Sequence, residues 1–403
     1  MTALATDADP VSESFLDSVL VEEPTARRVI AVHPHADLYG SDRMFLESAA
    51  ALGPDVLTVL SKDGPLLDAL GERGLAVRVE DFPVLRKVEL ANPFAAVRFL
   101  CRFAVSVVRL TRWLRSQDAG TVYVSTIAAP EWLIAGRLSG AHVVCHLHEN
   151  MPMRRPIGSV LLAPLLAAHR VIANSADTRA WVAASLGRWG ARRTVVVHNG
   201  VREPEVGTAP APDGTRRLAL VGRLSTIKGQ DTAIRAAALV RRAGFDVELT
   251  LVGDVYPGYE SIEAGLRELA AAEGIAEVTV FPGFVDPTPH VEAADVVLVP
   301  SRVESFGLAA VEALLLGRPV VASRVGGLRE VIRDDETGLL VDPDDPQALA
   351  DAVVALLTDP ERAAALGAAG RDDARARFSM TAFAAALAAA ALPEPHARRL
   401  EFR

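Results

Sequence analysis

Residues 303–323 read VESFGLAAVEALLLGRPVVAS, and the interpretation of the whole chain begins from this stretch. Two glutamates, Glu304 and Glu312, stand eight positions apart. The second lies in a run of alanine, valine and leucine that is typical of a buried helix. A carboxylate among apolar neighbours is costly unless a charged or hydroxyl-bearing group meets it. The partner of Glu312 is therefore the first thing to identify.

A strand, a loop and a helix are expected around the first glutamate. The run VVLVPS ends at Ser301, and the helix is expected from about Leu308 to Leu316, where a glycine and a proline follow and terminate it. Gly307 lets a ligand approach the backbone closely. The N–H groups of the first helical turn form an anion site that needs no basic side chain, so we expect a phosphate group there.

Both glutamates face one cleft if this helix extends back to Glu304. Eight residues at about 100° each then bring Glu312 to within roughly 80° of Glu304. A ribose with two adjacent hydroxyl groups would supply the hydrogen-bond donors that Glu312 needs. Alternatively, Glu312 pairs with Arg318 or with a neighbouring backbone group. The spacing of the residues does not decide between these interpretations.

A second motif, LVGRLSTIKGQD, occupies Leu220–Asp231. It places Arg223 and Lys228 at the expected carboxyl end of a strand. Two cations there can neutralise a diphosphate, because arginine offers a bidentate fork and lysine a mobile point charge. The alternative is a solvated surface loop. The nearby pair of glutamates favours the diphosphate interpretation.

Short β-branched segments alternate with longer alanine- and leucine-rich helical patterns from Arg28 onward, which predicts parallel strands joined by crossover helices. The pattern occurs twice, on either side of the proline- and glycine-rich segment EPEVGTAPAPDGT. We therefore predict an α/β fold of two Rossmann-like, doubly wound domains with a ligand cleft between them. The predicted divisions are a disordered leader (1–26), a first domain (27–201), a linker (202–215), a second domain (216–379) and a helix with a tail (380–403) that follows it.

The composition limits the classes of function. A net charge of -9 argues against a broad nucleic-acid-binding surface, and two cysteines support neither a disulfide framework nor a zinc cluster. We expect a cytoplasmic protein, because the first residues carry scattered acids rather than the basic and apolar segments of a signal peptide. There is no GxGxxG after the first strand and no GxxxxGK[ST] loop, which removes the main support for a dehydrogenase or a P-loop ATPase.

The segment 94–115 predicts a basic amphipathic helix. Four arginines, Arg98, Arg102, Arg109 and Arg112, fall within about 80° of one another on a helical wheel. Such a helix can rest on an anionic membrane surface, which would make the protein peripheral to the inner membrane. The alternative is an ordinary domain helix with a solvated basic face.

Taken together, these motifs resemble the second domain of retaining glycosyltransferases of the GT-B fold, in the large nucleotide-sugar-dependent family four, also called group 1. The resemblance rests on Gly222-Arg223 with Lys228-Gly229, on ESFGLAAVE, and on the following GRPVVASRVGGLREVI and ETGLLVDPDDPQALADAV. It is close over residues 216–379 and looser over residues 28–201. It implies two facing domains with the donor site in the cleft.

The resemblance also implies roles in the second domain. Arg223 and Lys228 match the residues that hold the donor diphosphate. Glu312 matches the glutamate that binds the ribose hydroxyls, and Glu304 matches a catalytic glutamate beside the transferred sugar. The donor-binding backbone is implied at Phe306, Gly307 and Leu308.

In the first domain, Gly40 matches a donor-binding glycine loop and His148 matches a catalytic histidine near the sugar. Asn199-Gly200 match the pair that closes the domain, and the final helix is expected to cross back onto it. Here His148 is followed by Glu149, whereas similar enzymes more commonly have aspartate.

The implied activity is that of a retaining, metal-independent hexosyltransferase without a cofactor. It would move a sugar from a nucleotide-sugar donor to a carbohydrate or lipid-linked acceptor in polysaccharide, glycolipid or other glycoconjugate synthesis. No histidine has a metal-ligand spacing such as HExxH, and Asp7 and Asp9 lie in the leader. Two alternatives remain, namely a nucleotide-sugar epimerase or phosphorylase of the same fold, and a non-catalytic sugar-nucleotide-binding protein.

Overall fold

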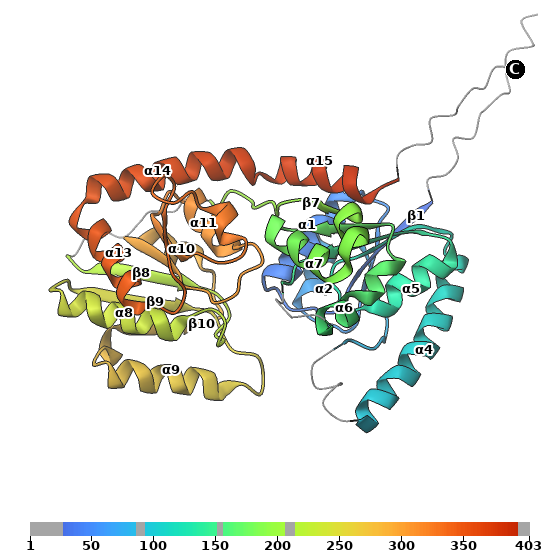
Figure 1. Ribbon diagram of the computed structural model, residues 1–403, viewed down its shortest axis with the longest axis horizontal. Coiled ribbons are helices and arrows are strands. Elements are labelled where there is room, and N and C mark those ends of the chain that lie inside the picture. Colours follow the sequence, from blue (N-terminus) through green and yellow to red (C-terminus); the bar gives the residue numbers. More distant parts are fainter. Residues whose placement is uncertain (1–26, 86–92, 151–155, 206–213, 394–403) are drawn as a thin grey trace, which may run out of the picture.

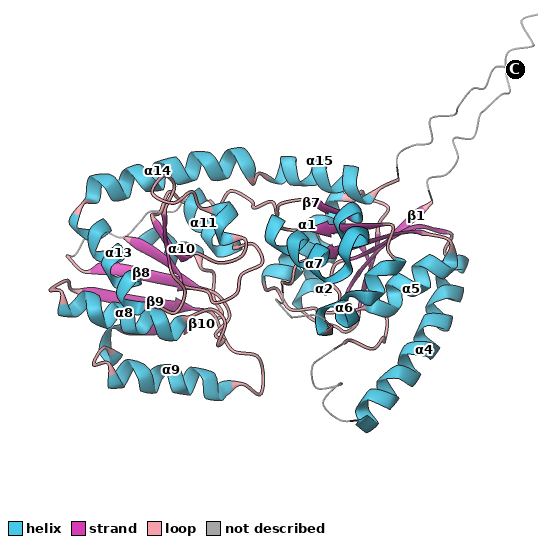
Figure 2. Ribbon diagram, in the orientation of Figure 1, coloured by secondary structure: helices cyan, strands magenta, loops and turns pink. Residues whose placement is uncertain are grey.

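The structure is a computed structural model that describes residues 27–85, 93–150, 156–205 and 214–393. It contains two lobes, each built on one sheet, and a long pair of helices bridges them along one side (Figure 1). In each lobe the strands form a central layer between helices (Figure 2). The prediction of two Rossmann-like α/β domains is confirmed.

The amino-terminal domain contains a sheet of parallel strands in the order β3-β2-β1-β4-β5-β6-β7. Its strands are β1 (Arg28–His33), β2 (Leu57–Leu60), β3 (Ala76–Val79), β4 (Ala119–Val124), β5 (His142–Leu147), β6 (Arg170–Ala173) and β7 (Thr194–Val196). Its helices are α1 (Gly40–Ala51), α2 (Pro65–Glu72), α4 (Pro93–Ser116), α5 (Pro130–Ser139), α6 (Ile157–Leu162), η1 (Ala163–Ala167) and α7 (Ala176–Arg193).

The carboxy-terminal domain contains a second parallel sheet, in the order β10-β9-β8-β11-β12-β13. Its strands are β8 (Arg216–Val221), β9 (Val247–Val252), β10 (Thr279–Gly283), β11 (Val296–Val299), β12 (Val320–Ser323) and β13 (Leu339–Val341). Its helices are α8 (Gln230–Arg242), α9 (Glu260–Ala272), η2 (Ala276–Val278), α10 (Thr288–Ala293), α11 (Leu308–Leu315), α12 (Leu328–Val331), α13 (Pro346–Thr358) and α14 (Pro360–Arg377), and α15 (Met380–Ala391) follows them.

Each sheet has a point where the strand order reverses. In the amino-terminal sheet β1 lies between β2 and β4, and in the carboxy-terminal sheet β8 lies between β9 and β11. Loops that leave the carboxyl ends of two such strands diverge to opposite faces of the sheet, which opens a crevice between them. The loops after β1, β8 and β11 contain the sequence motifs described above, so the topology brings these motifs to the two crevices.

Both faces of each sheet are buried, which explains the apolar strands. In the amino-terminal domain, α4, α5 and α7 pack on one face, and α1, α2 and α15 pack on the other. In the carboxy-terminal domain, α8, α9 and α13 cover one face, whereas α10, α11 and α12 cover the other. Parallel strands covered on both faces have nearly continuous hydrophobic sequences, because neither face meets water.

The helix α15 leaves the carboxy-terminal domain and packs on the amino-terminal one (Figure 1). Ser379 caps its first turn by accepting a hydrogen bond from the N–H of Ala382. Phe383 and Leu387 are buried in the core that also contains Phe45. Gly200 lies so close to this helix that a Cβ atom there would be 2.6 Å from the Cβ of Phe383. The last helix therefore completes a core formed by the first part of the chain.

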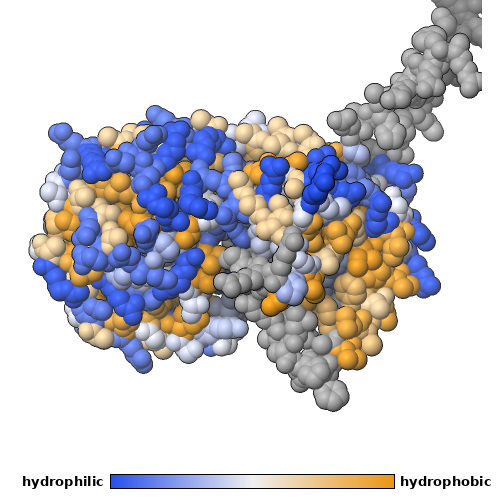
Figure 3. All heavy atoms as spheres, viewed as in Figure 1, coloured by the Kyte–Doolittle hydropathy of each residue, from blue (hydrophilic) through white to orange (hydrophobic). Residues whose placement is uncertain are grey.

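The helix α4 carries both apolar and basic side chains on its outer face. Val97, Leu100, Val105 and Val108 are each more than half exposed. Figure 3 shows apolar side chains gathered in the region of this helix. Arg102 and Arg109 do not form a purely solvated basic face, since they pair with Asp81 and Glu80. Within the described ranges, no helix has the length and apolar character needed to span a membrane.

Candidate active site

A cavity of about 580 Å³ lies between the two domains, at the carboxyl ends of their strands. The loop after β1, the loop after β8 and the loop between β11 and α11 all contribute to its walls. The structure brings all nine of the predicted site residues to this one cavity. They are Gly40, His148, Arg223, Lys228, Glu304, Phe306, Gly307, Leu308 and Glu312.

The loop Glu304–Gly307, which we call the donor loop, reaches the cavity in a way that the helical wheel did not predict. The helix α11 begins at Leu308, and Gly307 before it has a φ of 109°. The expected start of the helix at about Leu308 is confirmed, and the condition that it extends back to Glu304 is not met. The positive φ suits glycine, and a Cβ atom at Gly307 would meet Leu328 at 2.6 Å. The turn at Gly307, rather than helical spacing, brings Glu304 and Glu312 to the same cavity.

Phe306 belongs to the donor loop, but its side chain is part of the protein core. Its ring is 1% exposed and lies edge-on to Phe378, with the ring centroids 5.4 Å apart. A ligand in the cavity would therefore meet the backbone at this position. The buried ring instead anchors the donor loop to the domain below it.

Lys228 and Glu304 are paired with each other. The Lys228 Nζ atom lies 2.6 Å from Glu304 Oε2, and the hydroxyl group of Ser301 donates to the same oxygen at 3.3 Å. Both side chains are mostly buried. A cation and a carboxylate that were assigned to neighbouring parts of a ligand thus pair with each other.

The guanidinium group of Arg223 lies between two tyrosine rings. Its central carbon is 3.5 Å from the centroid of Tyr39 and 3.1 Å from that of Tyr256. Tyr39 comes from the amino-terminal domain, directly before Gly40, whereas Tyr256 follows β9. Stacking on aromatic faces stabilises the cation and leaves its N–H groups at the edge free to donate. The buried Nη1 atom of Arg223 has no partner among the described residues.

Glu312 forms an ion pair with Arg43 of helix α1, at 2.9 Å between Arg43 Nη1 and Glu312 Oε1. The alternative prediction that Glu312 pairs with Arg318 is wrong. The Arg318 side chain instead donates to the carbonyl oxygen of Ala294. Burial raises the pKa of Glu312, and the positive charge of Arg43 opposes this effect. Arg43 therefore helps to keep Glu312 ionised, from the opposite wall of the cavity.

His148 lies at the amino-terminal wall, with its ring tilted against that of His146 and the ring centroids 4.1 Å apart. Burial, together with the nearby His33, lowers the pKa of His148 to about 3. The imidazole is therefore neutral at pH 7. Its Nε2 atom is buried and has no partner among the described residues. The backbone oxygen of His148 accepts a hydrogen bond from Ser305 of the donor loop at 2.6 Å.

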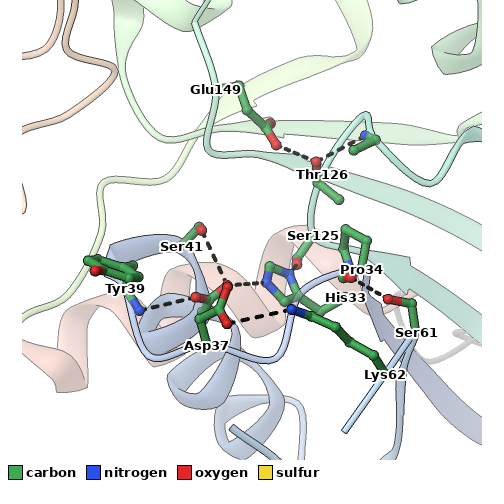
Figure 4. A network of polar contacts seen from close by, with 12 residues as sticks. His33, Pro34, Asp37, Tyr39, Ser41, Ser61, Lys62, Ser125, Thr126 and Glu149 are labelled. Atoms are coloured by element: carbon green, nitrogen blue, oxygen red, sulfur yellow. Dashed lines mark hydrogen bonds and ion pairs between the residues drawn. The ribbon is translucent and has the colours of Figure 1, made fainter. Parts of the chain in front are cut away.

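A buried polar network supports the glycine loop of the amino-terminal domain (Figure 4). His33 bonds Asp42 Oδ1 through Nε2 at 2.7 Å and Ser125 through Nδ1 at 2.5 Å. The second oxygen of Asp42 accepts the N–H of Tyr39 at 3.1 Å. Burial would raise the pKa of Asp42, but these hydrogen bonds hold it below its usual value. None of the three linked side chains lines the cavity, so the network holds the loop that presents Tyr39.

The motifs did not reveal Arg43, Tyr39 or Tyr256. Each of them acts across the cleft or between distant loops, and no local spacing indicates such a contact. Asp7 and Asp9 lie outside the described residues. Over the ranges that the structure does describe, there is no cluster of three or more metal-ligating side chains.

Comparison with protein families gives two matches that lie side by side. Residues 45–203 match the model described as Glycosyltransferase Family 4, and residues 215–359 match the model described as Glycosyl transferases group 1. Among curated proteins, the D-inositol 3-phosphate glycosyltransferase of Acidothermus cellulolyticus is 39% identical over 229 residues, covering 52% of this chain and 49% of that protein. The protein of the same name from Segniliparus rotundus is 41% identical over 177 residues, or 43% and 38% of the two chains. The chain spans about half the length of the first of these relatives.

Solved structures match over most of the chain. Anabaena HepE, in complex with UDP and glucose, has a TM-score of 0.77 at 23% identity and covers 90% of this chain and 98% of its own. The sucrose-phosphate synthase of Thermosynechococcus elongatus has a TM-score of 0.69 at 23% identity, covering 90% and 97%. At this identity the likeness establishes the fold, and the prediction of the GT-B arrangement is confirmed.

Proposed function

Because the chain belongs to the group 1, family 4 glycosyltransferases, we propose that it moves a sugar from a nucleoside diphosphate sugar to an acceptor hydroxyl group. One observation carries the proposal. Nine residues from both domains, predicted from the motifs and from the family resemblance, line one interdomain cavity whose volume suits a ligand of this size.

The diphosphate of the donor would bind at Arg223, Lys228 and the first turn of α11. Lys228 would exchange its contact with Glu304 for a phosphate oxygen, while Arg223 would donate from its unpartnered Nη1 atom and remain between the tyrosines. These cations and the positive helix end can stabilise the charge that develops on the leaving diphosphate. Because these positive groups can do the electrostatic work of a metal ion, they support our proposal of a metal-independent reaction. Activity lost in EDTA and restored by Mg²⁺ or Mn²⁺ would contradict it.

The ribose would bind at Glu312. Its carboxylate can accept hydrogen bonds from two adjacent hydroxyl groups if it remains ionised in its buried position. Arg43 favours that ionised form. Ribose binding is therefore a partial exchange, in which Glu312 keeps its charge and shares its oxygens between the arginine and the sugar hydroxyl groups.

The transferred sugar would lie between Glu304 and His148. Because the His148 imidazole is neutral at pH 7, we assign it the role of a hydrogen-bond partner for a sugar hydroxyl group rather than that of a cationic acid. We propose that the acceptor oxygen attacks the anomeric carbon on the face from which the diphosphate leaves. The acceptor oxygen gains the bond to that carbon, the bond to the diphosphate oxygen breaks, and the acceptor proton passes to the departing diphosphate. The product retains the anomeric configuration.

We further propose that the acceptor is a carbohydrate or a lipid-linked glycan and that the protein works at the cytoplasmic side of the membrane. The exposed apolar and basic face of α4 supports this placement. Synthesis of a surface polysaccharide or glycolipid would fit such an acceptor.

The ribose assignment gives a direct test of the donor site. Thermal-shift measurements with UDP, GDP, ADP and TDP would first select a nucleotide, and UDP heads the panel because it occupies the HepE structure. Glu312→Gln should weaken binding of that nucleotide about tenfold or more, because a charged acceptor of two hydroxyl groups is lost. Binding of its 2′,3′-dideoxy analogue should change less than twofold. Calorimetric titration measures both.

The exposed Glu268 provides a matched control, since Glu268→Gln removes the same charge far from the cavity and should leave both affinities unchanged. Equal losses for the ribose and dideoxyribose ligands would contradict the ribose assignment. Failure of every nucleotide to bind the wild-type protein would contradict the proposed donor site as a whole.

A further inference from the structure

One carboxylate of the carboxy-terminal domain, that of Glu330, has its side-chain hydrogen bonds with the other domain. Glu330 lies on α12, and its Oε2 and Oε1 atoms accept the N–H groups of Ala176 and Asp177 at 2.9 and 3.1 Å. Those amides belong to the first turn of α7, where a negative charge is favoured by the helix dipole. His198, which follows β7, contacts Oε2 at 3.1 Å. Glu330 thus caps a helix of the opposite domain.

These contacts are strong enough to control the charge of Glu330. Burial would raise the pKa of Glu330, but the hydrogen bonds from His198 and from the two amides hold it below its usual value. The carboxylate is therefore ionised at neutral pH. Hydrogen bonds to a charged group are the stronger kind. A cross-domain contact of this type fixes the orientation of the two domains better than exposed ion pairs do.

The segment that carries Glu330 also forms the floor of the donor loop. The N–H of Gly327 donates to the carbonyl oxygen of Glu304 at 3.0 Å. A Cβ atom at Gly326 would lie 1.9 Å from that oxygen, and one at Gly327 would lie 2.5 Å from the Cα of Phe306. No side chain fits between the two segments. A displacement of residues 326–330 would therefore be transmitted directly to the donor loop.

A second route connects Glu330 to the same loop. The ring of His198, which holds the Glu330 carboxylate, also lies beside Phe306, with their centroids 5.9 Å apart. On its other side, the donor loop touches the amino-terminal domain through Ser305, which donates to the backbone oxygen of His148 and accepts from Asn174. The donor loop thus lies between residues 326–330, which include Glu330, and the amino-terminal domain, whose helix α7 Glu330 caps.

We propose that Glu330 is a positioning residue that couples the conformation of the donor loop to the contact between the domains. The inference rests on the proposed function only in giving the loop its role in donor binding. When α7 and His198 hold Glu330, residues 326–330 support the donor loop in the geometry described here. When the domains separate, the carboxylate loses its partners and the loop loses its support. A complete donor site then exists only in the closed arrangement.

Hydrogen–deuterium exchange of the full chain without ligand tests the coupling. Glu330→Gln keeps the size of the side chain but loses the charge that holds the two amides. Exchange should become at least tenfold faster at residues 176–178 and at least threefold faster at residues 304–308. Arg329→Ala is the matched control, because Arg329 contacts Asp177 through an exposed ion pair and leaves the α7 amides bonded to Glu330. Its exchange should stay within twofold of the wild type in both segments.

If Glu330 only caps α7 and does not affect the donor loop, the exchange pattern differs. Faster exchange at residues 176–178 without any change at residues 304–308 would overturn the proposal. Added UDP provides the reciprocal measurement, because coupling between two sites acts in both directions. UDP should slow exchange at residues 176–178 in the wild type and lose this remote effect in Glu330→Gln. If UDP slows exchange nowhere in the wild type, that result counts against the proposed nucleotide, whereas the ligand-free comparison still decides the role of Glu330.

Discussion

Three charged side chains of the cavity have partners within the protein itself. Arg43 holds Glu312, Lys228 holds Glu304, and two tyrosines hold Arg223. Each pair avoids the cost of leaving a buried charge without a partner. On the proposed assignment, donor binding would exchange these partners and would also supply one to the unpartnered Nη1 atom of Arg223. The net free energy gained from each phosphate or hydroxyl contact is then the interaction energy with the new partner minus the interaction energy with the old one.

Glu131 is a buried carboxyl group outside the cavity, and within the described part of the chain it has no charged partner. It lies at the start of α5 with no exposure, and neither carboxylate oxygen has a partner among the described residues. Burial raises the pKa of Glu131 to about 8. The folded protein therefore binds a proton at neutral pH that the unfolded chain lacks. The free energy of unfolding consequently falls as the pH rises from about 4.5 to about 8.

Substitution by glutamine should remove this pH dependence. A pKa shift from 4.5 to about 8 corresponds to up to about 5 kcal/mol between the two ends of the range. We expect the melting temperature of Glu131→Gln, relative to the wild type, to be several degrees higher at pH 8.5 than at pH 5. Scanning calorimetry at the two pH values measures this. The exposed Glu361→Gln should show no such trend, and a constant difference for Glu131→Gln would contradict the assignment.

The sequence predicted the residues of the site better than their contacts. Arg223, Lys228 and Gly307 were found because strand ends, cations and a helix start occur together within a short segment. Arg43 was missed because its partner lies in the other domain, and only the folded arrangement places the two walls within reach of each other. The start of α11 at Leu308 was predicted correctly, but the helical wheel did not show how Glu304 reaches the cavity, because a positive φ at Gly307 has no signature in it.

For the helix α4, the amphipathic pattern predicted the basic face but not the contacts of its side chains. The arginines were recognised, but Arg102 and Arg109 turn toward acidic residues of their own domain. The exposed valines and leucine beside them were not recognised, because a wheel does not say which apolar side chains a neighbouring helix covers. Exposed apolar groups next to Arg98 and Arg112 are the combination expected of a helix that rests on anionic lipid.

Binding to vesicles tests this role of α4. The wild-type protein should sediment with vesicles that contain phosphatidylglycerol, more weakly with pure phosphatidylcholine, and less at high salt. The double variant Val105→Asp with Val108→Asp should reduce this binding at least tenfold, because it places two carboxylates at the lipid surface. Val280→Asp changes an exposed valine of the other domain and should bind like the wild type. Equal binding by both variants would contradict a lipid contact at α4.

The two domains share one core component. The helix α15 belongs to the end of the described chain, yet Phe383 and Leu387 lie in the core beneath α1. The alternation of strands and helices predicted the two sheets, because each sheet follows from local patterns. It did not predict which residues α15 touches, because an alanine-rich helix is apolar on most of its surface and does not specify its partner.

Removal of residues 380–403 should lower the stability of the amino-terminal domain. Burial of one large apolar side chain contributes about 2–4 kcal/mol, and two such side chains are lost with α15. We expect a fall in melting temperature of at least about 5 °C and increased binding of a hydrophobic dye. Deletion of residues 394–403 alone is the control, since it retains the helix. A truncated protein that melts like the wild type would show that α15 is dispensable.

The position of α15 also affects how the protein is made. A domain usually folds as it leaves the ribosome, at a synthesis rate of roughly 5–20 residues per second. Here the strands of the amino-terminal domain are complete once β7 has emerged, but α15 follows roughly 190 residues later. The nascent domain therefore waits roughly 10–40 s with the surface around Phe45 uncovered. During that time the apolar side chains that α15 covers in the folded protein lack this cover.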